Sequence, residues 1–401
     1  MALPIQPSSK VTNAAPPLPG RALGLVAIIA SVFISTLTLA IMTPLLAMKL
    51  AADGFGGGWI GLNAGAGAVA ILLVSMITPW LGRRLGSFQA LMLSILVMAV
   101  GVGLLPIWRS PTGWLVLRFL IGSGIAVHWV ISEVWINSAA EESDRGKVIG
   151  LYVAALSFAY LVGYPLLLAI GTEGNGPFVL VTALIVTAAI PILLARRLVP
   201  ALPPGAKGGT LDAVKRQPTV MGASLIAGFA IAVVLSFLII YAQRIGMTPR
   251  MALLALTAVA TGNVLLQIPI GMIADRVGAE KLLITVSSLG LAGLLLMPFL
   301  RLMDFWMWPF LFVWGGSLGG FYTLSLTLVG RRFRREDLAG ANAAFVIVYE
   351  LGGLLGPLAS GFALDLWNPN GALAPLALAY FVFIVGWLTT RTLRSRTAVA
   401  D

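Results

Sequence analysis

One stretch of the sequence carries ionisable side chains inside a segment that is otherwise apolar. From Trp114 to Lys147 the chain reads WLVLRFLIGSGIAVHWVISEVWINSAAEESDRGK, which includes Arg118, His128 and Glu133. A bilayer accepts charged groups at depth only where they face protein or water. Residues of these types in such a segment therefore indicate a binding site or a pathway for a solute or ion.

The spacing of these residues predicts that most of them share one face of a helix. Arg118, Gly122, Ile125, Trp129 and Glu133 fall within a stripe roughly 80° wide at about 100° per residue. We expect this stripe to face a cavity rather than lipid. Arg118 would bind an anionic substrate group or control the protonation of a carboxylate. The alternative is a structural arginine that is bonded to backbone carbonyls or extends toward the membrane surface.

A second acid is predicted near the middle of the membrane. Glu350 lies about eleven residues into an apolar segment, counted at the helical rise of 1.5 Å per residue. A carboxyl group at this depth can carry a proton if it alternates between two water-filled cavities. The alternative is a permanently protonated side chain bonded to a neighbouring helix.

The other polar and aromatic residues near these charges have two interpretations each. Glu133 either joins the site or pairs with arginines of the inner loops. His128 lies off the charged stripe, and is either a proton relay or a packed, hydrogen-bonded residue. Trp129, Tyr322 and Tyr349 either pack between helices or, for Trp129 above all, stack on an organic substrate or a cation.

The composition defines the class of protein. The chain has 401 residues, of which 59% are hydrophobic and 10% charged, against about 25% charged in soluble domains. It contains no cysteine and one histidine, which leaves no ligand set for a metal and no clustered groups for catalysis. We therefore expect a multi-pass membrane protein that is not an enzyme and uses no metal or cofactor. The net charge of +11 reflects membrane topology better than nucleic-acid binding.

The apolar segments predict an all-α membrane protein of twelve spans. They cover residues 23–47, 57–80, 87–107, 112–137, 147–170 and 176–195, followed by 219–241, 250–274, 280–300, 305–329, 339–363 and 371–391. Each is about as long as a bilayer requires. The predicted domains are a tail (1–22), a six-helix bundle (23–197), a linker (198–218), a second six-helix bundle (219–392) and a second tail (393–401).

The basic residues predict how the chain is oriented. With the N-terminus inside, 20 of the 26 Lys and Arg residues fall on inner segments and five on outer segments. Inner loops of membrane proteins carry such an excess of positive charge. Both termini are therefore predicted to be cytoplasmic, in the inner (plasma) membrane.

The two halves match at a nearly constant offset, which indicates a duplication. RRLG at 83–86 corresponds to DRVG at 275–278, an offset of 192, and Gly122, Asp144 and Gly163 correspond to Gly315, Asp337 and Gly356, an offset of 193. Because each unit has six spans, both copies enter the membrane in the same direction. The halves are then related by a pseudo-two-fold axis along the membrane normal.

Several motifs resemble those of the major facilitator superfamily. GMIADRVGAEK at 271–281 resembles its signature loop, and RFLIGSG at 118–124 resembles its fourth-helix pattern. HWVISEVWINSAAEESDRGKVIGLY and GGSLGGFYTLSLTLVGRRF resemble the uncharacterised YcaD-like bacterial branch. The resemblance implies the twelve-helix fold of that superfamily and a secondary transporter that works by rocker-switch alternating access.

The first copy of the signature loop departs from the pattern. It reads PWLGRRLG, so that Pro79 replaces the glycine that is Gly271 in the second copy, and Arg83 replaces the aspartate that is Asp275. The full Gly-x-x-x-Gly-Pro pattern of drug/proton antiporters lies in the segment 339–363 and not in 147–170. This weakens an assignment to drug antiport, and we expect the glycines to serve close helix packing.

Charges near these loops predict a cytoplasmic gate between the halves. Its candidate residues are Gly271, Asp275, Arg276, Gly278, Arg83, Arg84, Arg145 and Asp337. Asp275 is expected to face Arg145, and Arg83 and Arg84 to face the acidic pair at 336–337, when the cavity opens outward. The alternative is that these are solvated loop charges and helix caps worth about 0–1 kcal/mol each.

Together these patterns predict a proton-coupled secondary transporter of a small organic solute, acting as a monomer in the lipid bilayer. Its substrate and coupling residues would be Arg118, Glu350, Glu133, Trp129, His128, Tyr349 and Tyr322. Two carboxylates and one arginine suit an amphipathic or zwitterionic solute better than a bulky dianion. A lipid or amphiphile flippase, or a receptor or assembly factor on the same fold, is the alternative.

Overall fold

The computed structural model describes residues 18–140, 144–202, 210–334 and 337–400, and all regular structure in these ranges is helical. The first half contains α1 (Leu18–Ala52), α2 (Gly57–Leu85), α3 (Ser87–Leu104), α4 (Pro111–Ala139), α5 (Arg145–Ile170), α6 (Gly176–Thr187), α7 (Ala189–Leu194) and η1 (Arg196–Leu198). The second contains α8 (Thr210–Arg216), α9 (Pro218–Val233), η2 (Val234–Leu238), α10 (Ile239–Arg244), α11 (Pro249–Leu265), α12 (Gln267–Val277), α13 (Ala279–Leu296), η3 (Met297–Trp306), α14 (Met307–Arg332), α15 (Leu338–Leu366), η4 (Asn370–Ala372) and α16 (Ala374–Ala400).

All twelve predicted segments are helical, although several are interrupted. In the described ranges, nine helices are long and apolar enough to span a membrane, or ten if the pair α11 and α12, bent by 42°, is one span. Two predicted segments lie in Ala279–Arg332, where α13 and α14 are joined through η3 and the backbone turns at Asp304 (φ 43°), and the apolar part of the last helix, Ala374–Thr389, is shorter. The first helix begins at Leu18 instead of at residue 23, because its first turn packs on the protein through Arg21.

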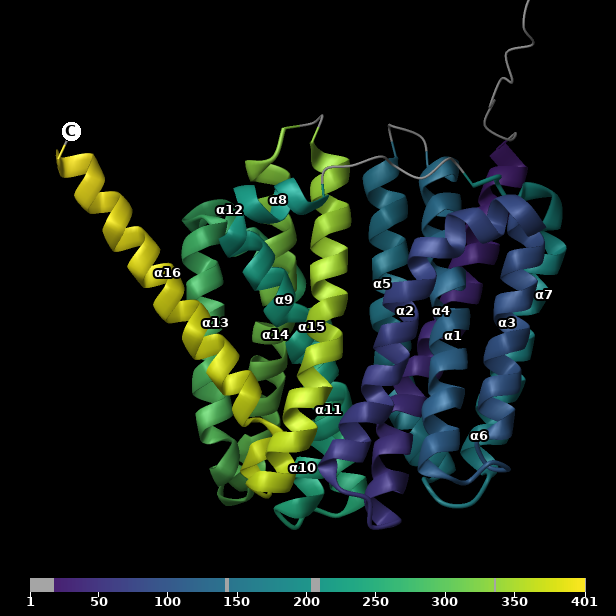
Figure 1. Ribbon diagram of the computed structural model, residues 1–401, viewed down its shortest axis with the longest axis horizontal. Coiled ribbons are helices and arrows are strands. Elements are labelled where there is room, and N and C mark those ends of the chain that lie inside the picture. Colours follow the sequence, from purple (N-terminus) through teal and green to yellow (C-terminus); the bar gives the residue numbers. More distant parts are fainter. Residues whose placement is uncertain (1–17, 141–143, 203–209, 335–336, 401) are drawn as a thin grey trace, which may run out of the picture.

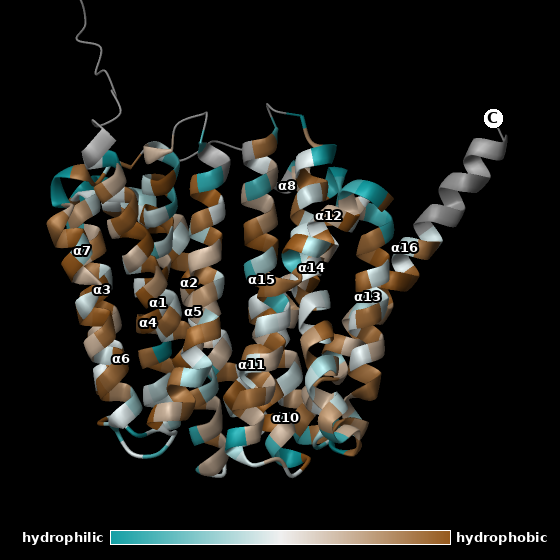
Figure 2. Ribbon diagram, turned by 180° about the vertical axis from the view of Figure 1, so that it is seen from behind, coloured by the Kyte–Doolittle hydropathy of each residue, from teal (hydrophilic) through white to brown (hydrophobic). Residues whose placement is uncertain are grey.

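The helices form two bundles that lie side by side (Figure 1), one built from α1 to α7 and the other from α9 to α16. We refer to the end where α1 and α5 begin as the terminal end and to the opposite end as the far end. Figure 2 shows mostly hydrophobic residues along the middle of the helices and hydrophilic residues gathered at the two ends. This distribution matches a hydrocarbon layer around the middle of the bundle.

The internal repeat is visible in how equivalent glycines pack. A Cβ atom placed on Gly122 of α4 would lie 2.5 Å from the carbonyl oxygen of Gly67 in α2. At the repeat-related position, a Cβ on Gly315 of α14 would lie 2.0 Å from the carbonyl oxygen of Val259 in α11. Both glycines therefore allow equivalent helix pairs to touch backbone to backbone, as small residues do between membrane helices.

A repeated ion pair ties the start of each half to its fourth and fifth spans. Arg21 places Nη2 at 2.7 and 2.6 Å from the two carboxylate oxygens of Asp144, and its Nε donates to the Ala139 carbonyl. In the second half Arg216 lies 3.0 Å from Asp337. The first pair is largely buried, with side-chain exposures of 8% for Arg21 and 36% for Asp144. The second is exposed, with 61% for Arg216 and 44% for Asp337.

The two halves touch through backbone contacts at the far end. A Cβ on Gly57 of α2 would lie 2.4 Å from the carbonyl oxygen of Gly361 in α15, and a Cβ on Gly61 would lie 2.3 Å from that of Pro357. These contacts confirm that the glycines of α15 serve helix packing. Because no side chain fits between the helices here, the far end is closed.

A carboxylate from the second half also caps a helix of the first half at this end. Asp365, near the end of α15, accepts the backbone N–H of Gly57 at 2.5 Å and that of Gly58 at 2.8 Å. Both groups belong to the first turn of α2, where N–H donors have no partner within the helix. The cap therefore exists only while the halves are in contact at the far end.

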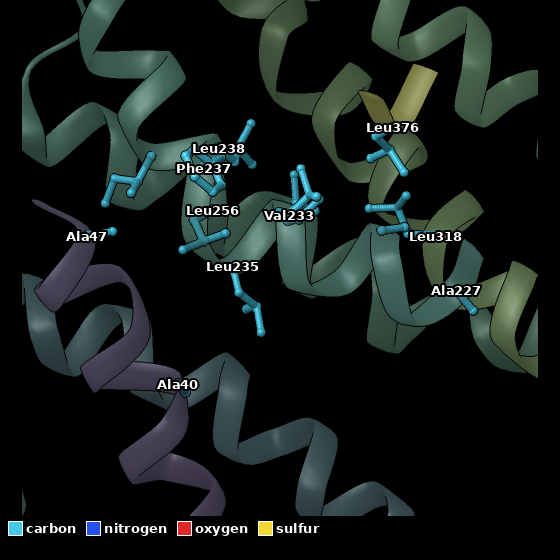
Figure 3. Close-up of a cluster of buried hydrophobic side chains, with 14 of the residues drawn as sticks. Ala40, Ala47, Ala227, Val233, Leu235, Phe237, Leu238, Leu256, Leu318 and Leu376 are labelled. Atoms are coloured by element: carbon cyan, nitrogen blue, oxygen red, sulfur yellow. The ribbon is translucent and has the colours of Figure 1, made fainter. Parts of the chain in front are cut away.

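A hydrophobic cluster joins the first helix to the second half. Figure 3 shows Leu235, Phe237 and Leu238 of the π-helical turn η2 near Leu256 of α11, with Ala47 of α1 on the opposite side. Phe237 and Leu238 are fully buried, and α1 contacts both η2 and α10. Apolar packing therefore holds α1 against the second half at the far end.

Candidate functional site

A cavity of about 640 Å³ lies between the two halves. Its walls come from α1, α2, α4 and α5 on one side and from α9, η2, α11, α12, α14 and α15 on the other. The polar side chains that line it are Thr43, Arg118, Trp129, Ser157, Tyr160, Tyr164, Ser236, Asn263, Gln267, Tyr322, Thr323, Thr327, Tyr349 and Glu350. Most of the other lining residues are apolar, and the volume is typical of sites for small molecules.

Arg118 lines this cavity from α4, as its position on the charged stripe predicts. Its side chain is 4% exposed, and its bonds are long: Nε to the Asn63 carbonyl at 3.5 Å and Nη2 to Thr43 Oγ1 at 3.4 Å. In the described part of the chain no carboxylate lies within 4 Å of the guanidinium. The cavity therefore contains a buried positive charge without a counter-ion.

Glu350 lies on the opposite wall at a similar depth. Arg118 lies over Gly67 of α2, and Gly65, two residues away, packs against Leu354 of α15. Glu350 is one turn from Leu354, so Arg118 and Glu350 differ in depth by about one helical turn of 5.4 Å. Among the described residues Glu350 has no hydrogen bond or ion pair. Opposite charges thus face each other from different halves.

Glu133 lies near the terminal end of α4 and is solvent-exposed although protein surrounds it on most sides. It is close enough to Glu350 for the two carboxylates to interact electrostatically. The alternative pairing with an inner-loop arginine does not occur among the described residues. Glu133 therefore lies at the terminal-end approach to the cavity.

Tyrosines lie near the two carboxylates. The rings of Tyr322 and Tyr349 meet edge to face, with centroids 5.3 Å apart and planes at 73°. Both tyrosines line the cavity together with Glu350, whereas Glu133 is not among the lining residues. The structure therefore brings Glu350, Tyr322 and Tyr349 together in the cavity wall and places Glu133 on the approach to it.

Trp129 and His128 are adjacent in sequence but have different surroundings. Trp129 lines the cavity, and its Nε1 is buried without a hydrogen-bond partner. His128 is fully buried inside the first half, with Nε2 3.2 Å from Ser31 Oγ and Nδ1 3.5 Å from Ser94 Oγ. It is absent from the cavity wall. This position fits a packed, hydrogen-bonded histidine and does not support the proton-relay hypothesis.

Two breaks in helix geometry lie at the cavity wall. α11 and α12 meet at a 42° bend, where Gln267 donates to Asn263 Oδ1 at 3.1 Å and both side chains line the cavity. Between α9 and α10 the π-helical turn η2 presents Leu235 and Ser236 to the same space. Such irregular turns are common at functional sites because they redirect side chains.

Among the described residues, the predicted gate residues Asp275, Asp337 and Arg84 have their partners within their own half. Asp275 pairs with Arg331 at 2.9 Å, and Asp337 with Arg216 at 3.0 Å, each within the second half. Arg84 lies over the ring of Trp80 at 5.2 Å from its centroid. The side chain of Arg145 and residue 336 lie outside the described part of the chain. The latch was expected for the opposite conformation, and it stays a prediction.

The glycines of the signature loop have separate roles. Gly278 adopts φ of 92° where α12 ends, and Gly86 adopts 91° where α2 ends. Only glycine takes this backbone conformation without strain. Gly271 has open space where a Cβ would be, and Arg276 is exposed beside it. The paired turns are a further trace of the duplication.

Sequence reasoning missed two tyrosines of α5 and the far-end cap. Tyr160 and Tyr164 line the cavity from α5. The signal was present, because the cavity residues of α5 recur at helical spacing: Val153, Leu156, Ser157, Tyr160 and Tyr164. For Asp365 no local signal exists, since its partners are 307 and 308 residues away in the chain.

Comparison with known proteins identifies the family. The sequence profile of the Major Facilitator Superfamily matches residues 28–248 and 220–400. The chain therefore belongs to the Major Facilitator Superfamily, as its motifs predict. It is a multi-pass membrane transporter of that family and not an enzyme.

Individual relatives are distant. The uncharacterized MFS-type transporter YcaD of Escherichia fergusonii is 22% identical over 360 residues, which cover 89% of this chain and 93% of the relative. The nucleoside transporter NupG matches with a TM-score of 0.74 at 13% identity, covering 91% of this chain and 98% of its own. A bacterial homologue of the human lysosomal transporter Spinster, in an inward-facing and unoccupied conformation, matches with a TM-score of 0.68 at 16% identity, covering 92% and 93%. At these identities the structural matches show the fold alone.

Proposed function

We propose that this protein moves a small, amphipathic organic solute across the bacterial inner membrane, coupled to protons, by rocker-switch alternating access. The observation that carries the proposal is the cavity between the halves, with Arg118 and Glu350 unpaired on opposite walls. A solute that contacts both walls interacts with both halves at once. Its binding free energy can therefore bias how the halves are arranged.

The proposed orientation of the chain implies a conformational state. With both termini in the cytoplasm, the closed far end faces outward. The exposed Glu133 then lies on the cytoplasmic approach to the cavity, and the described ion pairs at the terminal end stay within single halves. This arrangement corresponds to an inward-facing conformation.

Glu350 is the proposed proton carrier. It lies near mid-membrane in the cavity wall and has no hydrogen bond or ion pair among the described residues. A carboxyl group without a fixed counter-ion can be neutralised by a proton or by a substrate charge. Alternation of the cavity between the two sides would expose it to each aqueous phase in turn.

The test is flux in proteoliposomes. A thermal-shift screen of metabolites at two pH values first identifies a stabilising solute. That solute should then drive proton movement, and a pH gradient should drive its accumulation. Flux of labelled phospholipid between leaflets, without solute flux, would assign the flippase alternative. Binding without any flux would assign a receptor.

A further inference from the structure

Glu350 and three tyrosines, Tyr160, Tyr322 and Tyr349, line one region of the cavity, and Glu133 and Tyr152 lie near them toward the terminal end. The cluster contains Glu133, Glu350, Tyr152, Tyr160, Tyr322 and Tyr349. Its members come from both halves, since α4 and α5 face α14 and α15. Among the described residues no Lys or Arg forms a salt bridge with either carboxylate.

We propose that this cluster binds an organic cation: an ammonium group carried on an apolar body. The inference rests on the proposed function, and names its substrate class. Tyr322 and Tyr349 pack edge to face and line the same cavity as Glu350, and aromatic rings attract cations electrostatically. The indole of Trp129, with its unpartnered Nε1, lines the same cavity. Carboxylates together with aromatic faces recognise a weakly hydrated, bulky positive group.

The surroundings favour an organic cation over a metal ion. In the described part of the chain no group of three His, Cys, Asp or Glu residues could hold a metal. A hard cation requires six or more oxygen ligands, whereas this cavity is mainly apolar beyond its few polar groups. The volume of about 640 Å³ accommodates a ring or chain attached to the charged head.

Arg118 orients the bound cation. It lies on the wall opposite Glu350 and is held by Asn63 and Thr43. A positive head is repelled from the guanidinium and attracted to the carboxylates. The head therefore lies at Glu350, and the apolar body lies along lining residues such as Ile71 and Leu256.

The experiment measures binding of matched ligands to the purified full-length protein by calorimetry. Benzyltrimethylammonium is the cation, 2,2-dimethyl-3-phenyl-1-propanol the neutral analogue, and hydrocinnamate the anion. Benzyltrimethylammonium carries a permanent charge, so its own charge does not change with pH. We expect the cation to bind at least about tenfold more tightly than either of the others.

Variants assign the effect to the cluster. Glu350→Gln should lower the affinity for the cation at least about tenfold and leave the affinity for the neutral analogue unchanged. Tyr349→Phe keeps the π face and should retain binding, whereas Tyr349→Leu should lose it. Glu173→Gln, which removes an exposed carboxylate at the far end, is the matched control and should have no effect.

Other results would overturn the inference. If the neutral analogue binds as tightly as the cation, the substrate class is different. The same holds if hydrocinnamate binds most tightly and this preference is lost in Arg118→Met. Transport of a neutral or anionic solute without cation binding leaves the proposed function in place and removes this inference. Cation binding with the expected ranking but without flux keeps the site and removes the transporter mechanism.

Discussion

At the residue scale, the cavity is defined by charges that lack partners. Arg118 is almost completely buried with two long hydrogen bonds, and Glu350 has no hydrogen bond among the described residues. Burying a charge without a counter-ion is unfavourable. Strained or uncompensated groups of this kind occur at functional sites, where activity is retained at a cost in stability.

Arg118→Met should therefore stabilise the protein and abolish transport. Replacing a buried charged group by an apolar side chain of similar volume is stabilising by about 1–4 kcal/mol in other proteins. Thermal unfolding in detergent should show a higher midpoint, while solute flux in proteoliposomes falls to background. A lower midpoint would show that the bonds to Asn63 and Thr43 are structural and would contradict this prediction.

Glu350→Gln should separate exchange from coupling. The amide keeps the shape of the side chain but cannot carry a proton between the two sides. We expect accumulation driven by a pH gradient to fall at least about tenfold, while solute exchange at equal pH continues when the solute is saturating. The control is Glu173→Gln. Accumulation that persists at the wild-type level in Glu350→Gln would place proton coupling elsewhere.

At the element scale, the contact between α2 and α15 determines whether the far end is closed. Glycine-mediated backbone contact and the Asp365 cap act at the same place. The cap satisfies N–H groups that would otherwise face water once the halves separate. It therefore stabilises one conformation of the transporter relative to the other, not the fold of either half.

Asp365→Ala should shift the protein toward opening at the far end. Loss of a helix cap is worth about 1 kcal/mol, a factor of about five in the conformational equilibrium. Because the chain has no cysteine, a single Thr323→Cys variant reports on the cavity without background. Impermeant maleimide added from the far side should label it faster in the Asp365→Ala background.

The matched control for this measurement is Asp53→Ala. Asp53 is an exposed acid at the same end, in the connection between α1 and α2. The Asp53→Ala variant should leave the labelling rate of Thr323→Cys unchanged. Equal labelling rates in all three backgrounds would show that the glycine contacts alone keep the far end closed.

The repeated ion pairs should differ in their effect on stability. Arg21→Gln removes a largely buried partner of Asp144 and should destabilise by about 1–3 kcal/mol. Arg216→Gln changes the exposed counterpart in the second half and should cost about 0–1 kcal/mol. Thermal unfolding of the two variants side by side tests this, and similar midpoints would contradict it.

At the scale of the whole molecule, the two halves contact each other at the far end in one conformation and at the terminal end in the other. The far end is closed in this structure, while Asp275 and Asp337 pair with arginines of their own half. When the terminal end closes, these acids come within reach of the first half. The predicted cytoplasmic latch therefore belongs to the conformation with the far end open.

Arg83→Glu should then favour the conformation seen here. Reversing this charge weakens attraction to the acidic pair at 336–337 only when the terminal ends meet. Labelling of Thr323→Cys from the far side should become slower. Adding Asp337→Arg to Arg83→Glu should restore the original labelling rate. Unchanged accessibility in the single variant would contradict the latch.

The sequence by itself determined the class of protein, the twelve helical segments, the duplication and four residues of the cluster. Composition and span length follow from the bilayer, and repeated glycines such as Gly122 and Gly315 are visible as a fixed offset. Glu133, Glu350, Tyr322 and Tyr349 could be predicted because charge and aromatic rings are rare and conspicuous in apolar helices.

Only the tertiary structure decided which of these side chains meet. Ser31 and Ser94 enclose His128, and Asp365 reaches α2 from over 300 residues away. The pairing of Asp275 with Arg331 depends on which ends of the halves touch. Contacts between distant segments depend on how helices rotate and approach one another, and helical periodicity contains no information about that approach.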